Sequence, residues 1–304
     1  MSRQTRTQGF TKAIGKWLGT AEVYDGHGRF LGNATDRRHV QRQAGENRVR
    51  IELSFIGPLK FAGHYYIEDH TDFRLYQGPA NTGFAETLAE NLIDAHAYWP
   101  VTGLTQRFFL MILPDGNRQI SLGLMSRGEK LIYTVVGEYQ RVENEQSGIP
   151  ALVNGTAYDL HDDPAGGRGE ILLQRNGRWQ GTLQALDGDL QKAGQSAYVE
   201  NVSGTDGRLQ VTVSGTAFVE ETAVTTLTTN QWEAWSDAGN LVGSYSMSGG
   251  RALSGQFHFL QEQLRVWRRE VVSHDGAMKA VVHTWYRGGA RVGVQFGVLE
   301  FTPA

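Results

Sequence analysis

Apolar and polar residues alternate along most of the chain in short runs, separated by pairs such as Asp-Gly, Gly-Gly and Arg-Gly. Alternation with a period of two is typical of strands with one buried face, and glycine pairs mark the turns between them. The clearest predicted strands are residues 48–55, 64–69, 106–113, 119–125, 130–141, 208–213, 264–272, 278–286 and 290–301. Residues 83–92 are an exception, because Phe84, Leu88 and Leu92 recur at helical spacing and predict a short helix.

The two halves of the chain repeat one another. Gly-Lys-Trp-Leu-Gly-Thr at 15–20 aligns with Gly-Arg-Trp-Gln-Gly-Thr at 177–182, an offset of 162 residues (177 minus 15). Further along, Asp-Gly at 115–116 and Arg-Gly at 127–128 align without gaps with the same pairs at 275–276 and 287–288, an offset of 160 (275 minus 115). We therefore predict a duplication: a first barrel at 1–146, a linking or bridging segment at 147–175 and a second barrel at 176–304.

Composition narrows the class of protein. The formal net charge of -3 provides no surplus of basic residues to neutralise phosphates, so we expect no nucleic-acid partner. The chain has no cysteine, which excludes disulfides and thiolate metal sites and fits a reducing compartment. No apolar run is long enough to span a membrane or to serve as a signal peptide. We therefore predict a cytoplasmic protein with no membrane partner.

Each half opens with a Gly-x-Trp motif, at Gly15 to Trp17 and Gly177 to Trp179. This motif on the first strand of a small barrel resembles the lipocalin (calycin) superfamily, and Thr-Asp-Phe at 71–73 is similar to that family's Thr-Asp-Tyr motif. The second half has Asn-Gln-Trp-Glu-Ala-Trp at 230–235 instead, which keeps both aromatic positions. The resemblance implies an up-and-down barrel that can hold one small apolar ligand. The prediction is an all-β chain of two tandem lipocalin-like antiparallel β-barrels with few short helices.

The repeat also separates residues that serve the fold from residues present in one half only. Trp17 and Trp179 occur in both halves and receive a structural interpretation. The first half alone has a polar strand at 64–70, whose counterpart at 223–229 is Ala-Val-Thr-Thr-Leu-Thr-Thr. A period of two places His64, Tyr66 and Glu68 on one face of this strand.

A second strand of the first half, 94–99, places His96 and Tyr98 on a common face. If the two strands converge inside the barrel, their imidazole, carboxylate and phenol groups can exchange protons near neutral pH. The candidate catalytic residues are His64, Tyr66, Glu68, His96 and Tyr98. The alternative is that this polar face is the solvent side of the barrel.

Large aromatic residues are the candidates for contact with an apolar ligand. They are Phe73, Tyr76, Trp99 and Phe108 in the first half and Trp267 and Trp285 in the second. The alternative is ordinary packing of the barrel core and its ends.

Metal and cofactor motifs are weak. Neither His64 with His70 nor His-Asp-Asp at 161–163 has a recognised metal-ligand spacing, so we predict no metal site. Haem bound through one histidine, His96 or His283, is left open by analogy with some small calycin-like barrels. The glycine-rich run at 166–169 lacks the strand and helix of a nucleotide loop, and we predict no cofactor.

The sequence therefore predicts a protein that binds a small, largely apolar organic molecule in a barrel cavity, with the first barrel favoured. Cofactor-independent acid–base chemistry of the lyase, isomerase, hydratase or cyclase type is the first hypothesis. A non-catalytic carrier or sensor is the second, and an interaction module with filled barrels is the third. A homo-oligomer is left open.

Overall fold

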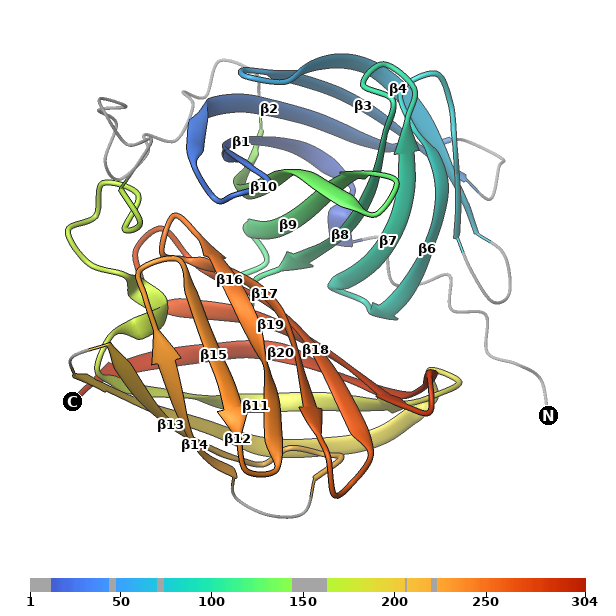
Figure 1. The fold of residues 1–304 in the computed structure, drawn as a ribbon. Helices are drawn as coiled ribbons and strands as arrows, with labels where there is room; N and C mark the ends of the chain where they lie inside the picture. Colours follow the sequence, from blue (N-terminus) through green and yellow to red (C-terminus); the bar gives the residue numbers. More distant parts are fainter. Residues whose placement is uncertain (1–11, 44–47, 70–73, 144–162, 206, 220–222) are drawn as a thin grey trace. The chain divides into compact units, whose positions relative to one another are not determined.

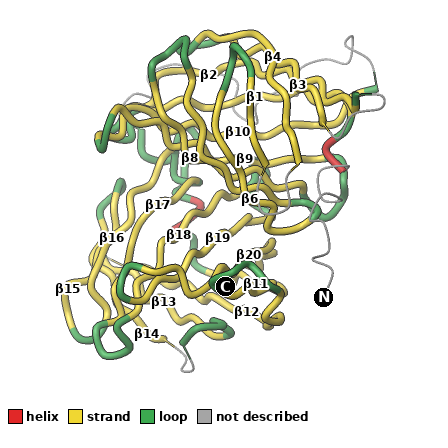
Figure 2. The backbone as a smooth tube through the Cα atoms, turned by 90° about the vertical axis from the view of Figure 1, so that its right-hand side faces the viewer, coloured by secondary structure: helices red, strands yellow, loops and turns green. Residues whose placement is uncertain are grey.

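The computed structural model describes residues 12–43, 48–69, 74–143, 163–205, 207–219 and 223–304. The chain divides into two compact units, Met1–Ala157 and Tyr158–Ala304. Strands account for most of the described backbone, and helical structure is limited to short 3-10 turns such as η3 (Leu172–Gln174), as Figure 2 shows. None of the helices in these described ranges is long and apolar enough to cross a membrane. The predicted all-β class is confirmed.

The first unit is a closed antiparallel barrel of ten strands, in which each strand pairs with its neighbours in sequence and the last pairs with the first (Figure 1). The strands are β1 (Gly15–Asp25), β2 (Phe30–Arg42), β3 (Arg48–Ile56), β4 (Lys60–Asp69), β5 (Arg74–Gln77), β6 (Thr82–Ala89), β7 (Leu92–Trp99), β8 (Leu104–Ile112), β9 (Arg118–Arg127) and β10 (Lys130–Val142). Closure leaves no edge strand to pair with another chain.

The second unit is a barrel of the same topology, closed by pairing of its first and last strands. Its strands are β11 (Gly177–Asp187), β12 (Lys192–Thr205), β13 (Arg208–Ser214), β14 (Ala223–Thr229), β15 (Glu233–Ala238), β16 (Leu241–Ser248), β17 (Ala252–Phe259), β18 (Leu264–Val272), β19 (Met278–Arg287) and β20 (Ala290–Pro303). The prediction of two tandem antiparallel barrels is confirmed. The proposed domain boundaries stay a prediction, because residues 147–162 lie outside the described residues.

The turns explain why the two halves align at an offset of 160. Gly116 and Gly276 adopt φ values of 72° and 70°, which only glycine adopts without steric cost. The aspartate before each glycine accepts a backbone hydrogen bond, Asp115 from Asn117 N at 2.9 Å and Asp275 from Ala277 N at 3.0 Å. The hairpins that follow also share their register. Residues that are 160 positions apart in this part of the chain therefore occupy equivalent places in the two barrels.

The predicted helix at 83–92 is wrong, because these residues form β6, a turn and the start of β7. A β-bulge between Thr87 and Ala89 shifts the register of β6 against β7. Phe84, before the bulge, is 47% exposed, whereas Leu88, within it, is 6% exposed. The bulge breaks the period of two, so these residues lie on opposite faces of the strand although they are four apart in the sequence.

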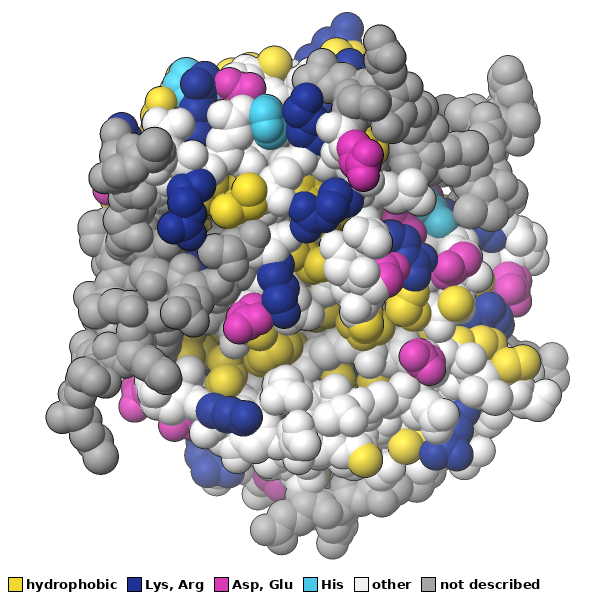
Figure 3. Space-filling model, turned by 180° about the vertical axis from the view of Figure 1, so that it is seen from behind, with side chains coloured by type: hydrophobic (Ala, Val, Ile, Leu, Met, Phe, Trp, Pro, Cys, Tyr) yellow, Lys and Arg dark blue, Asp and Glu magenta, His cyan; other side chains and the backbone are white. Residues whose placement is uncertain are grey.

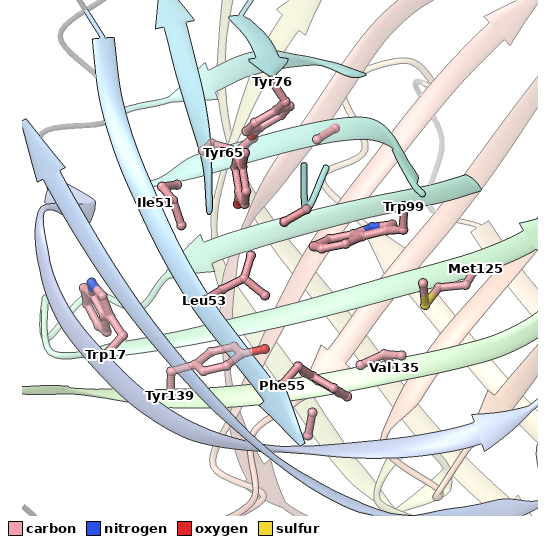
Figure 4. Close-up of a cluster of buried hydrophobic side chains, with 14 of the residues drawn as sticks. Trp17, Ile51, Leu53, Phe55, Tyr65, Tyr76, Trp99, Met125, Val135 and Tyr139 are labelled. Atoms are coloured by element: carbon pink, nitrogen blue, oxygen red, sulfur yellow. The ribbon is translucent and has the colours of Figure 1, made fainter. Parts of the chain in front are cut away.

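The interior of each barrel is filled mainly by apolar and aromatic side chains, as Figure 4 shows for the first. Trp17 is buried there, and its Nε1 donates to Ala13 O at 2.8 Å. The guanidinium of Arg141 lies 4.4 Å from the centre of the Trp17 ring. In the second barrel the equivalent Trp179 is also buried. Burial of both tryptophans accords with their structural interpretation.

The described surface carries charges of both signs. On the face drawn in Figure 3, Lys and Arg side chains are interspersed with Asp and Glu, and apolar side chains lie between them. This mixture agrees with the small net charge of -3 and gives this face no single-signed field that would attract a polyanion.

Candidate functional site

The predicted catalytic residues of β4 lie on the outer face of the first barrel. Tyr65 and Ile67 point inward and are 8% and 1% exposed, so His64, Tyr66 and Glu68 occupy the opposite face. The outward residues contact one another: the rings of His64 and Tyr66 are 5.6 Å apart. These contacts are those of a barrel exterior.

The predicted catalytic residues of β7 are also outward. Tyr98 is 43% exposed, and the ring of His96 lies 5.5 Å from Phe84 on the outer face of β6. Strands β5 and β6 separate β7 from β4 in the sheet. The structure therefore does not bring His64, Tyr66, Glu68, His96 and Tyr98 together inside the barrel, which the hypothesis required. Their catalytic role stays a prediction, but the convergence inside the barrel that it required is not present among these residues.

The predicted ligand contacts are divided between interior and exterior. Trp99 and Phe108 line a cavity of the first barrel, Tyr76 is buried beside Tyr65, and Trp285 lines a cavity of the second barrel. Trp267 lies on the outer face of β18, where its Nε1 donates to Ser254 Oγ at 3.2 Å, and it lines neither of these cavities; its role as a ligand contact stays a prediction. Phe73, with the Thr-Asp-Phe motif, lies outside the described residues.

The first barrel contains one small polar cluster within its aromatic cavity. Asp36 Oδ2 accepts hydrogen bonds from Arg38 Nε at 3.1 Å and Nη2 at 2.6 Å. Arg38 Nη2 also donates to the Tyr139 hydroxyl at 2.8 Å. Burial raises the pKa of Tyr65 to about 12, and it also raises the pKa of Tyr139 well above its usual value. This cluster holds two phenols neutral and contains no histidine.

The second barrel holds a larger group of ionisable side chains, here named the buried charge cluster. It consists of Glu200 on β12, Arg268 and Glu270 on β18, and Lys279 and His283 on β19. Lys279 Nζ bridges the two carboxylates, at 2.5 Å from Glu200 Oε1 and 3.0 Å from Glu270 Oε2. Arg268 bridges them as well, through Nη2 to Glu200 and Nε to Glu270, both at 2.7 Å.

The charges of this cluster support one another. Burial alone would raise the pKa of Glu270, but the charges of Arg268 and Lys279 and the hydrogen bond from His283 hold it well below its usual value. The pKa of Glu200 is lowered in the same way, against the effect of burial, mainly by Lys279 and Arg268. Both carboxylates are therefore ionised near neutral pH.

His283 is the titratable member of the cluster. Its Nε2 lies 2.8 Å from Glu270 Oε1, and burial lowers its pKa below the usual value of 6.5 despite that carboxylate. Because Glu270 is ionised, Nε2 carries the proton and donates it, which makes Nδ1 an acceptor with a free lone pair. Among the described residues Nδ1 has no hydrogen-bond partner. A carboxylate thus fixes the tautomer and orientation of a neutral imidazole.

His283 and Arg268 form the polar wall of an otherwise largely apolar cavity of about 60 Å³. The cavity is also lined by Tyr198, Val211, Val213, Thr216, Val219, Thr225, Leu227, Leu241, Phe257, Phe259, Val266 and Trp285. This volume corresponds to about two water molecules. A larger ligand would therefore require some of the lining side chains to move.

The internal repeat shows that the cluster belongs to the second barrel alone. At the offset of 160, Arg268 and Glu270 stand where the first half has Phe108 and Leu110. His283 replaces Gly123, and the cross-strand pairs Phe108 with Gly123 and Arg268 with His283 share one register. Comparing the halves position by position would have shown that these three positions differ between the halves, but not that the three side chains face inward.

The fold and the site define a tandem of two closed antiparallel barrels with interior cavities. The chain is similar to a solved structure of a protein with unknown function from the DUF3598 family of Nostoc punctiforme, with a TM-score of 0.62 and 14% identity. That match covers 98% of this chain and 100% of the other. At this identity the likeness shows the fold alone.

Two other solved structures are less similar. They are S-type phycobiliprotein lyase from Guillardia theta (10% identity, 47% of this chain and 96% of that chain, TM-score 0.35) and kievitone hydratase from Nectria haematococca (8% identity, 99% and 93%, TM-score 0.25). These TM-scores are too low to carry an argument. No protein-family model matches the chain, and no curated protein matches its sequence.

We expect the free energy of unfolding of the second barrel to fall as pH is lowered through the usual histidine pKa of 6.5 toward the lower pKa of His283 in the folded protein. The pKa of His283 lies below 6.5 in the folded protein and returns to that value on unfolding. Between these two pKa values the unfolded state binds more protons, so stability is lost as pH falls. Denaturant unfolding at several pH values measures the slope. A His283→Asn variant should give a shallower slope, and an equal slope would contradict the assignment.

Proposed function

We propose that the second barrel binds a small, largely apolar organic molecule and that His283 moves a proton to or from it. One observation carries the proposal: an imidazole oriented by Glu270, with Nδ1 unpartnered among the described residues, lies in the wall of an apolar cavity. A neutral histidine held by a carboxylate is a general base, and it becomes a general acid once protonated. This chemistry belongs to the lyase, isomerase, hydratase or cyclase type.

Three properties of the surroundings favour proton transfer at this position. The lowered pKa of His283, caused by burial, keeps the imidazole neutral near pH 7. Glu270 accepts from the opposite nitrogen and stabilises the imidazolium that forms when Nδ1 takes a proton. The apolar wall strengthens both interactions, because charges interact more strongly away from water.

A carrier without catalysis is the second candidate, and the first barrel supports it. Its cavity of about 50 Å³ is lined by Phe55, Phe61, Trp99 and Phe108, and no histidine lies among the residues that line it. A barrel that binds in this way needs shape and aromatic contact only. Both cavities are small, which also agrees with the third hypothesis, an interaction module whose barrels are filled by side chains.

Nuclear magnetic resonance of ¹⁵N-histidine-labelled protein tests the proposal. Cyclohexane, cyclohexanol and pentan-2-one are titrated as probes of increasing polarity. We expect the Nδ1 and Nε2 signals of His283, assigned with a His283→Gln variant, to shift on binding. Those of His258, an exposed histidine of the same barrel, should not move.

The result has three outcomes. Shifts confined to His283 support the proposed site in the second barrel. Shifts at His64 or His96 would instead return the site to the outer face of the first barrel. If no histidine signal responds to any probe, the proposal is wrong for this class of ligand and the filled-barrel alternative is favoured.

A further inference from the structure

The charges around the cavity limit the kind of molecule that can enter it. Two carboxylates, Glu200 and Glu270, face two cations, Arg268 and Lys279, at nitrogen-to-oxygen distances of 2.5 to 3.0 Å. His283 adds no charge while it is neutral, so the buried charge cluster is electrically balanced. An anionic ligand would place an uncompensated charge in an apolar environment, which is unfavourable. The cavity is therefore suited to a neutral molecule.

The hydrogen-bonding groups of the cavity wall limit the ligand further. Arg268 uses Nε and Nη2 on the two carboxylates, and its Nη1 makes no hydrogen bond to any described residue. His283 uses Nε2 on Glu270 and keeps Nδ1 as an acceptor. Besides the hydroxyl groups of Tyr198, Thr216 and Thr225, the wall therefore offers one cationic donor and one basic acceptor.

The donor and the acceptor come from neighbouring strands at the same level of the barrel. Arg268 on β18 and His283 on β19 are directly opposite in the antiparallel register. Side chains at such positions have Cβ atoms about 4.5–5.5 Å apart. They can therefore contact two nearby atoms of one small ligand.

We infer that the substrate of this site is a neutral carbonyl compound, whose oxygen accepts from Arg268 Nη1 while His283 Nδ1 takes a proton from the adjacent carbon. This inference rests on the proposed function. A carbonyl group and its α C–H present an acceptor and an acidic proton on neighbouring carbons. That arrangement matches the donor and acceptor of the cavity wall.

The step balances in atoms and charge. The lone pair of Nδ1 forms an N–H bond as the α C–H bond breaks, and the C–H electron pair becomes a C=C bond. The C=O pair moves onto oxygen, where Arg268 stabilises the enolate, while Glu270 stabilises the imidazolium. If the N–H proton exchanges with solvent first, reprotonation of the α-carbon by the imidazolium gives exchange, and delivery of the proton to the enolate oxygen gives the isomeric enol. Departure of a β-hydroxyl, protonated by the imidazolium, gives water and an enone.

Exchange of α-protons for deuterium in D₂O tests the inference without a known substrate. Two matched methyl ketones are compared: neutral pentan-2-one and anionic 4-oxopentanoate, which carries a carboxylate at the end of the same chain. We expect the protein to accelerate exchange of pentan-2-one above the buffer rate and to leave 4-oxopentanoate at that rate. Proton nuclear magnetic resonance follows the loss of the α-proton signal.

Variants assign the step to its residues. We expect His283→Gln to lower the protein-dependent rate at least about 100-fold, which is the usual contribution of a general base. Arg268→Lys keeps the charge, loses the planar donor and should also lower the rate. His258→Gln, a change of an exposed histidine, should leave it unchanged. Circular dichroism confirms that each variant is folded.

Each outcome separates this inference from the proposed function. Equal exchange of 4-oxopentanoate would overturn the neutral-substrate inference and leave proton transfer by His283 standing. Binding of pentan-2-one at His283 without exchange would overturn the carbonyl step and leave the binding site. Exchange that survives in His283→Gln would overturn both the inference and the assigned base.

Discussion

The variant Glu270→Ala is expected to lower the free energy of unfolding of the second barrel by about 3–5 kcal/mol. Glu270 is fully buried and contacts Arg268, Lys279 and His283. Its removal leaves two cations sharing the single carboxylate of Glu200, with no water to solvate the excess charge. Hydrogen exchange of the β11–β20 amides, measured by mass spectrometry, reports the stability of this barrel.

The matched control replaces the whole charged set rather than one member. A variant with Glu200→Leu, Arg268→Met, Glu270→Leu and Lys279→Met should be about as stable as the parent, because apolar side chains of similar volume commonly replace buried ion pairs without loss. It should lose the chemistry proposed for the site. A cost below about 1 kcal/mol for Glu270→Ala would instead mean that the charges are solvated.

Much of the fold could be predicted because its determinants are local. The predicted strand at 264–272 agrees with β18 at both ends, Leu264 and Val272. The paired turns at Gly116 and Gly276 require positive φ, and a side chain other than glycine would be strained there. Such positions can be recognised from sequence alone, and two copies in register made the duplication evident.

The direction of the strand faces could not be predicted in the same way. Strand β4 has tyrosines at two adjacent positions, so one of them must lie on each face. Only the structure shows that Tyr65 points into the barrel and Tyr66 points out of it. On the outer face the guanidinium of Arg48 lies 4.5 Å from the centre of the Tyr66 ring. Because a shift of one residue exchanges the two faces, the predicted cluster at His64 and Glu68 depended on a choice that periodicity does not make.

The buried charge cluster was missed for a related reason. Arg268, Arg269 and Glu270 are consecutive, so charged side chains lie on both faces of the strand. The sequence pattern therefore does not indicate which face points into the barrel. The third strand of the cluster is distant, since Glu200 precedes Arg268 by 68 residues. Contact between them depends on closure of the barrel, which is a tertiary property.

The variant Trp285→Ala is expected to destabilise the second barrel by about 3–5 kcal/mol and to enlarge its cavity. Trp285 is 2% exposed and packs between Phe218 and Phe259, with ring centres 5.6 Å and 5.7 Å away. Barrel walls of paired strands cannot collapse fully into the space that remains. Xenon binding, followed by ¹²⁹Xe nuclear magnetic resonance, should increase, because apolar cavities of this kind bind the gas.

Two further variants separate loss of volume from loss of a polar group. Trp285 Nε1 is buried without a hydrogen-bond partner among the described residues, a condition that usually costs about 1–3 kcal/mol. Trp285→Phe removes this donor, keeps an aromatic ring and should cost much less than alanine. Met125→Ala, at the equivalent position of the first barrel, should destabilise that barrel and leave hydrogen exchange in β11–β20 unchanged. Equal costs for alanine and phenylalanine at 285 would show that the ring does not fill the cavity wall, and ligand entry would then need no displacement of this side chain.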